Sequence, residues 1–198
     1  MPRLLVVAFT VIACVVTTRA ESATPEQFIN ELAQQAIAVS AQNAPQQQKV
    51  EQFRALLNRG FDVPLIGKFV LGRYWPKATD AEKAEYLKLF EDYIVRSYAK
   101  RFEAYQGEQL QVLGSRQDAN GALLVGTVMQ RPGGGEPVRI EWQVQPAGGS
   151  YNVVDVVVEG VSMGVTQRSE FSSVIRRGGG DVATIIDALK KILAQLQS

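Results

Sequence analysis

The stretch VRIEWQVQPAGGSYNVVDVVV, from Val138 to Val158, decides the fold class of this chain. Its first part alternates apolar and polar residues, which is the period of a β-strand with one buried face. Pro146-Ala147-Gly148-Gly149 then breaks the pattern, and a second apolar run continues to the end of the stretch. Two such runs joined by a glycine-rich turn indicate an antiparallel hairpin. We expect its inward face to carry Val138, Ile140, Trp142, Val144, Val154, Val156 and Val158.

Two earlier segments show the same two-residue period. Leu110 and Val112 alternate with polar residues, and residues 123–130 form a second apolar segment. Asn120-Gly121 lies between these segments and is typical of a type I′ hairpin turn. A glycine-rich turn then leads to the hairpin described above. Together the four segments predict a four-stranded antiparallel meander.

Capping signals place helices on both sides of the sheet in the sequence. Thr24-Pro25-Glu26-Gln27 combines an N-cap, a proline at the first helical position and a capping-box glutamine. A second capping box, Thr79-Asp80-Ala81-Glu82, opens the longest predicted helix. The predicted helices cover residues 25–42, a segment that ends at Gly60, and residues 63–71, 80–105, 167–177 and 182–195. Helices before and after an antiparallel sheet indicate an α+β fold in one domain.

The longest predicted helix has an aromatic inner face. Leu87, Phe90, Ile94, Tyr98, Phe102 and Tyr105 recur at a spacing of three to four residues. This spacing places them along one side of the helix, where they would face the interior.

The stretch LGRYWPKATDAEK, from Leu71 to Lys83, joins this helix to the one before it. Gly72 and Pro76 stop the preceding helix, and Thr79 starts the next one. Two interpretations of the three middle residues remain open, a packed corner between helices or the mouth of a binding pocket. These residues are Arg73, Tyr74 and Trp75.

The N-terminal residues are typical of an export signal. An apolar run from Leu4 to Val16 follows Arg3, and small residues precede a cleavage site after Ala20. The run is too short to span a membrane as a mature helix. We therefore expect residues 1–20 to be a signal peptide and residues 21–198 to form an exported domain. The alternative is a lipoprotein signal that ends at Cys14, but the apolar run continues past this cysteine.

The composition of the mature chain excludes several kinds of site. Removal of residues 1–20 leaves neither cysteine nor histidine, and the loss of two arginines changes the net charge from +1 to −1. Disulfides, thiolate nucleophiles, Ser-His-Asp triads and nearly all zinc sites are thereby excluded, and we expect no metal or cofactor. A near-neutral chain also lacks the clustered positive charge on which nucleic-acid binding depends.

Paired carboxylates are the remaining catalytic option. Asp155 and Glu159 share one face of the last strand, but a rise of about 3.3 Å per residue separates them by roughly 13 Å. Glycosidase pairs need roughly 5–9.5 Å. The glycines at 178–180 lack the preceding strand and the Gly-Lys-Ser/Thr ending of a phosphate-binding loop. We expect a protein that is not an enzyme, with a small-molecule enzyme as the alternative.

The inward apolar surface of the hairpin and the long helix has two interpretations, a filled core or a lined cavity, which periodicity cannot distinguish. Two stretches favour the cavity, FVLGRYWPKATDAEKAEYLKLFEDYIVRSYAKRFEAY (69–105) and VVDVVVEGVSMGVTQRSEFSSVIRRGGG (153–180). They resemble the MlaC family of periplasmic phospholipid-binding proteins, also known as toluene-tolerance proteins. The most specific parts are the 71–75 turn and the 159–162 turn, which Arg168 and Phe171 follow.

This resemblance implies a nuclear-transport-factor-2-like, cone-shaped α+β fold whose sheet and helices enclose a hydrophobic cavity. It implies a carrier that shuttles phospholipids between the outer and inner membranes of Gram-negative bacteria and maintains outer-membrane lipid asymmetry. The implied partners are phospholipid acyl chains, an inner-membrane MCE-domain ABC transporter and an outer-membrane lipoprotein–porin complex. We expect the carrier to be a monomer.

We expect the acyl chains to lie between the long helix and the sheet. The candidate lipid-contacting residues are Phe69, Val70, Tyr74, Phe90, Ile94, Tyr98, Phe102, Ile140, Trp142, Val144, Val156 and Val158.

Overall fold

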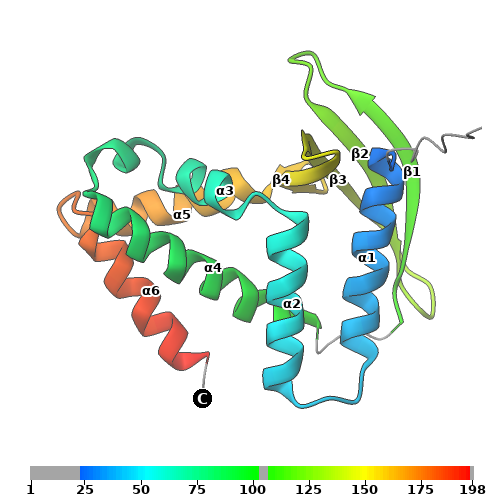
Figure 1. Ribbon diagram of the computed structural model, residues 1–198, viewed down its shortest axis with the longest axis horizontal. Helices are drawn as coiled ribbons and strands as arrows, with labels where there is room; N and C mark the ends of the chain where they lie inside the picture. Colours follow the sequence, from blue (N-terminus) through cyan, green and yellow to red (C-terminus); the bar gives the residue numbers. More distant parts are fainter. Residues whose placement is uncertain (1–22, 103–106, 197–198) are drawn as a thin grey trace, which may run out of the picture.

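The computed structural model describes residues 23–102 and 107–196 of the 198-residue chain. It consists of an antiparallel sheet and six α-helices (Figure 1), which confirms the predicted α+β fold. The predicted signal peptide, the Phe102 side chain and Tyr105 lie outside what is described. Within the described ranges, none of the helices combines the length and the apolar character needed to cross a membrane.

The sheet is a meander in which each strand pairs with the next in chain order. Its strands are β1 (Gln109–Gln117), β2 (Leu123–Gln130), β3 (Val138–Ala147), β4 (Ser150–Val158) and β5 (Val161–Ser162). The four predicted strands are confirmed, and β5 is an addition that the sequence did not predict. It forms because Glu159 (φ 49°) and Gly160 (φ 79°) turn the chain tightly back onto β4. Positive φ at both central residues is the requirement of a type I′ turn.

The predicted type I′ turn at Asn120-Gly121 is wrong, although the hairpin between β1 and β2 is present. A type I′ turn needs positive φ at both central residues. Gly121 has a φ of 80°, but Asn120 lacks a positive φ, because Glu159 is the only non-glycine residue with positive φ in the described part of the chain. The Asp118 carboxylate accepts hydrogen bonds from the N–H groups of Asn120 and Ala122, both at 2.8 Å. This side chain therefore organises a wider loop than a two-residue turn.

Strand register defines an inner face of the sheet. Val158 lies opposite Ile140, and Val156 lies opposite Trp142. A register shift beside Val144 then places Val153 opposite it, and Val153 is fully buried. The prediction that Val154 points inward is therefore wrong, because one extra residue in a strand moves every following side chain to the other face.

The helices confirm most of the predicted boundaries. They are α1 (Pro25–Ala41), α2 (Gln46–Gly60), α3 (Val63–Leu71), the 3₁₀ helix η1 (Gly72–Lys77), α4 (Asp80–Phe102), α5 (Met163–Arg177) and α6 (Ala183–Gln195). Both predicted capping boxes form, and the Thr24 hydroxyl accepts the Gln27 N–H at 3.2 Å. Helix α5 begins earlier than predicted, because the Ser162 hydroxyl accepts the Val165 N–H at 3.0 Å and caps it.

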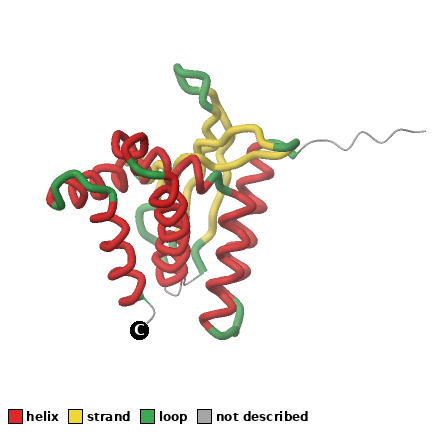
Figure 2. Tube along the Cα trace, turned by 60° about the vertical axis from the view of Figure 1, so that its left-hand side comes forward, coloured by secondary structure: helices red, strands yellow, loops and turns green. Residues whose placement is uncertain are grey.

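Four helices contact the sheet, and α4 and α6 pack mainly on other helices. Helix α1 packs on β1, β2 and β4, while α2, α3 and α5 contact β4. Helix α4 packs chiefly on α2, α3 and α6 (Figure 1), so this central helix meets other helices rather than the sheet. Figure 2 shows the strands gathered at the top of the molecule, with helices extending to the left and below.

The joint between α3 and α4 is a packed corner. Gly72 ends α3 with a φ of 56°, and a Cβ at this position would lie 2.6 Å from Arg168 Nε. Tyr74 is buried at 4% exposure, and the half-buried Trp75 packs beside it. The first of the two interpretations of this joint is therefore confirmed for both aromatic residues, while Arg73 is exposed.

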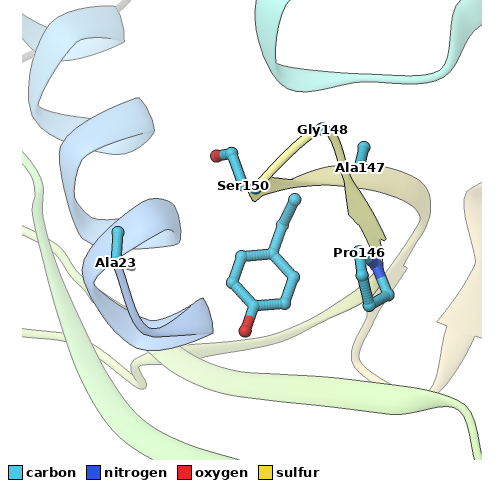
Figure 3. A pocket seen from close by; sticks show the side chains of 7 residues that line it. Ala23, Pro146, Ala147, Gly148 and Ser150 are labelled. Atoms are coloured by element: carbon cyan, nitrogen blue, oxygen red, sulfur yellow. The ribbon is translucent and has the colours of Figure 1, made fainter. Parts of the chain in front are cut away.

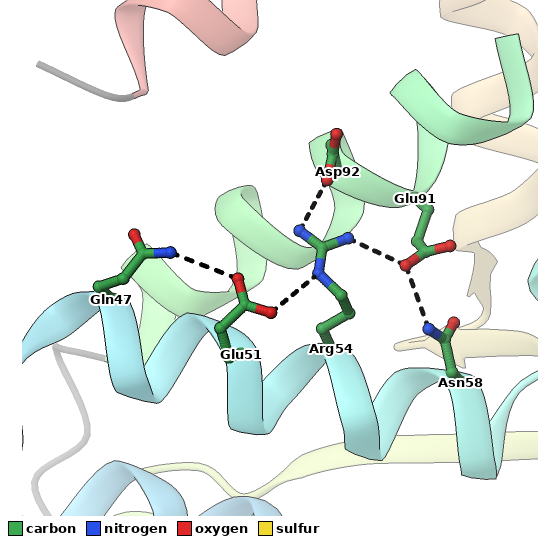
Figure 4. Close-up of polar contacts among 6 residues, drawn as sticks. All are labelled: Gln47, Glu51, Arg54, Asn58, Glu91 and Asp92. Carbon is green, nitrogen blue, oxygen red and sulfur yellow. Dashed lines mark hydrogen bonds and ion pairs between the residues drawn. The ribbon is translucent and has the colours of Figure 1, made fainter. Parts of the chain in front are cut away.

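A charged network fastens α2 to α4 (Figure 4). The Arg54 guanidinium lies 2.9 Å from Glu91 Oε1 and 2.6 Å from Asp92 Oδ1, and Asn58 also donates to Glu91. Glu51 on α2 adds a longer contact of 3.5 Å. The Arg54 side chain is only 23% exposed, so solvent screens these charges less than on an open surface.

We expect Arg54→Met to lower the free energy of unfolding by about 1–3 kcal/mol, because it removes the guanidinium from two partly buried carboxylates, of which Glu91 keeps only the neutral donor Asn58. Arg59→Met is the matched control, since Arg59 is exposed on the same helix. Urea unfolding measures both variants. A similar loss in the two variants would show that the network contributes nothing specific.

Candidate functional site

The interior contains three separate apolar clusters rather than one continuous core. The helical cluster lies between α3, η1, α4, α5 and α6 and includes Tyr86, Phe90 and Phe171. The sheet cluster joins Ile29 and Leu32 of α1 to Val125, Val144 and Val153. The third, the α1–α2–α4 cluster, consists of Val39, Val50, Phe53, Val95 and Ala99. Partly buried residues at the end of α2, including Leu56, Leu57 and Phe61, lie where these clusters meet.

The inner face of β3 and β4 continues beyond the sheet cluster. Trp142 and Val156 are half-buried and pack at its edge. Ile140 (6% exposed) and the half-buried Val158 lie further along the same face and belong to none of the three clusters. The part of the inner face that carries Ile140 and Val158 is therefore apolar but belongs to none of the three clusters.

The C-terminal half of α4 presents a second apolar surface. Leu87 faces Gly67 of α3, whereas Val95 faces α2 in the α1–α2–α4 cluster. At 100° per residue, Ile94 and Tyr98 lie within about 20° of Leu87, on the side of α4 that faces α3. Helices α2 and α3 meet at residues 61–62, which bond to Val153 of β4. Ile94 and Tyr98 therefore lie on the α3 side of α4, and α3 in turn contacts β4.

The polar groups on this part of the sheet are satisfied within it. Thr127 is the buried polar residue of the described chain, at 1% exposure. Its hydroxyl donates to the Ile140 carbonyl at 3.1 Å and accepts the Trp142 indole N–H at 3.0 Å. The Thr127 hydroxyl and the Trp142 indole N–H are thus both engaged in hydrogen bonds within the sheet. A ligand on this surface would meet mainly apolar side chains.

The titratable groups near the helical cluster and β4 have structural roles. Tyr86 donates to the Gly67 carbonyl at 3.0 Å, and burial raises the pKa of its phenol well above the usual range. The Asp155 carboxylate accepts hydrogen bonds from the Ser162 hydroxyl and the Gly164 N–H. Glu159 accepts the N–H of the neighbouring strand at residue 139. The described residues contain no group of three acidic, histidine or cysteine side chains suited to a metal ion.

The predicted lipid-contacting residues fall into separate groups. Four lie together on the inner face of the sheet, and two lie on the side of α4 that faces α3. Three others are packed inside the helical cluster, one belongs to the sheet cluster and one is exposed on α3. The residues on the sheet are Ile140, Trp142, Val156 and Val158, and those on α4 are Ile94 and Tyr98. Val70, Tyr74 and Phe90 are in the helical cluster, Val144 is in the sheet cluster, and Phe69 is the exposed residue.

The prediction omitted inward residues of β2. Val125 lies opposite Trp142, and Thr127 lies opposite Ile140, on the same inner face. The alternation of residues 123–130 was sufficient to find both of them. Phe61 was also missed, and no sequence signal identifies it because it follows the end of a helix.

Two hollows open mainly away from this inner face, although Thr127 and Ile140 also line the second. One of about 290 Å³ lies between the start of α1 and the β3–β4 turn (Figure 3), and it is lined by Ala23 and residues 146–151. The other, of about 660 Å³, opens mainly on the outer face of the sheet beside Leu113, Val128 and Val157. It mixes these apolar side chains with Arg139, Glu141 and Glu159.

Comparisons with known proteins agree with this architecture. The MlaC protein family matches residues 15–191, which is nearly the whole chain. A solved structure of a phospholipid-binding protein from Ralstonia solanacearum, in complex with a phospholipid, has the same fold with a TM-score of 0.75. The two sequences are 19% identical, and the match covers 89% of this chain and 100% of the other. The chain therefore belongs to the MlaC family.

Proposed function

We propose that this protein is a phospholipid carrier that holds acyl chains between the inner face of the sheet and α4. The main observation in support is the set of apolar residues on these two elements that lies at the edges of the packed clusters or outside them. Ile140, Trp142, Val156 and Val158 supply one wall, and Ile94 and Tyr98 supply the other. The Ralstonia protein, which shares the fold, was solved with a phospholipid bound.

The size of the hydrophobic effect supports a carrier that retains its ligand. Two acyl chains contain on the order of 30 methylenes, and each buried methylene contributes about 0.8 kcal/mol. The gross transfer free energy, roughly 24 kcal/mol, exceeds the practical limit of about 18–21 kcal/mol for non-covalent binding. Ordering costs offset part of it. Release should therefore be slow until a partner opens the site.

The proposal places the headgroup in water. No charged side chain is among the residues proposed for the two walls, so the binding energy comes from the tails. We therefore expect weak selectivity between headgroups.

We further propose, on the basis of the family, that the protein works in the periplasm after cleavage of residues 1–20. There it would carry phospholipids between an outer-membrane lipoprotein–porin complex and an inner-membrane MCE-domain ABC transporter, and so maintain outer-membrane lipid asymmetry. The sheet walls support binding without chemistry, because the Thr127 hydroxyl and the Trp142 indole are both occupied by internal hydrogen bonds. An enzyme on this fold would need a free polar group at that position.

Lipid extraction tests the proposed function. The protein should be purified from the periplasm of a Gram-negative host without detergent, denatured, and analysed by mass spectrometry for released lipid. We expect diacyl phospholipid at near-stoichiometric amounts. A control sample that was unfolded, delipidated and refolded should regain lipid from vesicles. A lipid-free native preparation that also takes up none would contradict the proposal.

A further inference from the structure

Four exposed apolar side chains gather where α3 meets the start of α5. Leu65 (39% exposed) and Phe69 (42%) are one turn apart on α3, while Val161 (53%) and Val165 (56%) flank the start of α5. The Phe69 ring lies 3.3 Å from the position that a Cβ on Gly164 would take, which joins the two helices. We call these four residues the α3–α5 patch.

Three cations border the α3–α5 patch. Lys68 precedes Phe69 in sequence, and the Arg168 guanidinium carbon lies 5.1 Å from the centre of the Phe69 ring. Arg168 also reaches Gly72, which is followed by the exposed Arg73. None of the three cations forms an ion pair with a carboxylate in the described parts of the chain.

Of three carboxylates close to the patch in sequence or by contact, two are bound to helix N-termini. Asp62 accepts the Leu65 N–H at 3.0 Å at the start of α3. Asp155 accepts the Ser162 hydroxyl at 2.5 Å and the Gly164 N–H at 3.0 Å at the start of α5. The positive ends of the two helix dipoles offset these negative charges. The third carboxylate, Glu159, accepts the N–H at residue 139. Against it stand the three bordering cations, so an approaching surface meets a net positive charge.

The positive charge extends over the whole of this layer. Residues 63–79 and 163–177, which form α3, η1 and α5, contain six lysine and arginine residues and one carboxylate. The entire chain has a net charge of only +1. The charge is thus distributed unevenly, and one side of the protein is suited to an anionic surface.

We propose that the α3–α5 patch docks this protein on the surface of an anionic phospholipid bilayer. Lysine and arginine near such a surface are attracted to its lipid headgroups, and apolar side chains between them enter the interface. Neither of the two hollows described above includes a residue of the patch. The patch consists of four separately exposed apolar side chains bordered by cations, which suits a fluid lipid surface.

This inference rests on the proposed carrier function and deepens it, because it names the surface at which lipid would be exchanged. The patch and the proposed tail site are formed by different residues. Docking and lipid retention can therefore be measured independently.

Vesicle co-sedimentation tests the proposal directly. The mature protein should bind vesicles of phosphatidylcholine that contain phosphatidylglycerol, and it should bind vesicles of phosphatidylcholine alone much more weakly. Salt at about 0.5 M should largely release it, because the screening length is then only a few ångströms. Equal binding to both kinds of vesicle, or no binding to either, would overturn the proposal and leave a protein partner as the occupant of the patch.

Two pairs of variants assign the binding to the patch. Lys68→Ala with Arg73→Ala should weaken partitioning into anionic vesicles about 25-fold, at about fivefold for each lost cation. The charge-matched control is Lys88→Ala with Lys191→Ala, which removes exposed lysines from α4 and α6 and should have little effect. Similar losses in both doubles would refute a localised patch.

The apolar part of the patch is tested by Leu65→Ser with Val165→Ser. This double variant should weaken vesicle binding about tenfold, since it removes apolar atoms that enter the interface. Ile192→Ser on α6 is the control, because its side chain is also exposed, at 38%.

All of these variants should keep their co-purified phospholipid. Loss of vesicle binding with lipid retained would support the patch. Normal vesicle binding in a protein that never holds lipid would instead contradict the proposed function. Binding that none of the patch substitutions alters would overturn the α3–α5 assignment.

Discussion

Val158→Asp should abolish phospholipid retention, whereas Val157→Asp should leave it intact. The two valines are neighbours on β4, and both are half-buried. Val158 lies opposite Ile140 on the inner face, while Val157 lies opposite Glu141 on the outer face. A carboxylate placed against acyl chains loses its hydration without a compensating partner, which costs several kcal/mol. The amount of lipid released from each purified variant measures the effect.

These two variants control for each other. Both place the same charge on the same strand, so their solubility and expression should be similar. Far-UV circular dichroism and urea unfolding establish that both are folded. Full retention by Val158→Asp, or equal loss in both variants, would contradict the assignment of the inner face as the lipid wall.

Phe171→Ala should lower the free energy of unfolding by about 3–5 kcal/mol. Phe171 is 5% exposed and lies at the centre of the helical cluster. Its ring centroid is 6.3 Å from that of Tyr86, 6.1 Å from that of Phe90 and 6.1 Å from that of Tyr93. Truncation to alanine removes three aromatic contacts and leaves a cavity between α4 and α5. Thermal and urea unfolding measure the change.

The same variant separates folding from ligand binding. The helical cluster contains none of the residues proposed to contact lipid except Ile94 at its edge. Below its unfolding transition, Phe171→Ala should therefore retain phospholipid. Val174→Ala, which truncates a smaller and only half-buried side chain of the same helix, should cost much less. A stability loss below about 1 kcal/mol for Phe171→Ala would show that the cluster tolerates the cavity.

The sheet was largely predictable because one face of each strand is buried. The alternation from Val138 to Val144 identifies β3 and its inner face correctly. The prediction fails at Val154, where the strand accommodates an extra residue that leaves no mark in the hydrophobic pattern. It also fails at Asn120, since the local turn is organised by backbone N–H groups that donate to the Asp118 side chain.

The inner face of α4 was harder to predict because this helix has neighbours on several sides. A single stripe from Leu87 to Tyr105 was expected, yet Tyr86 and Phe90 pack in the helical cluster while Val95 and Ala99 pack against α1 and α2. A spacing of three to four residues identifies one apolar stripe. It cannot show which residues of the helix pack against which neighbouring helix.

The candidate site was predictable only in part for the same reason. The inward residues of β3 and most of those of β4 were predictable from the two-residue alternation of apolar and polar side chains. The choice between a residue that packs on protein and one that is left for a ligand depends on tertiary contacts. Tyr74 and Phe90 have the same apolar character as Tyr98, but only the first two are closely packed in the helical cluster.

Fluorescence quenching by phospholipids with brominated acyl chains tests the position of the tails most directly. The chain has two tryptophans, one on the inner face of the sheet and one in η1 beside the helical cluster. In the Trp75→Phe variant, Trp142 should be strongly quenched when brominated lipid is loaded. In Trp142→Phe, the remaining Trp75 should be unaffected. Quenching of Trp75 alone, or of neither tryptophan in a lipid-loaded protein, would contradict the proposed tail site.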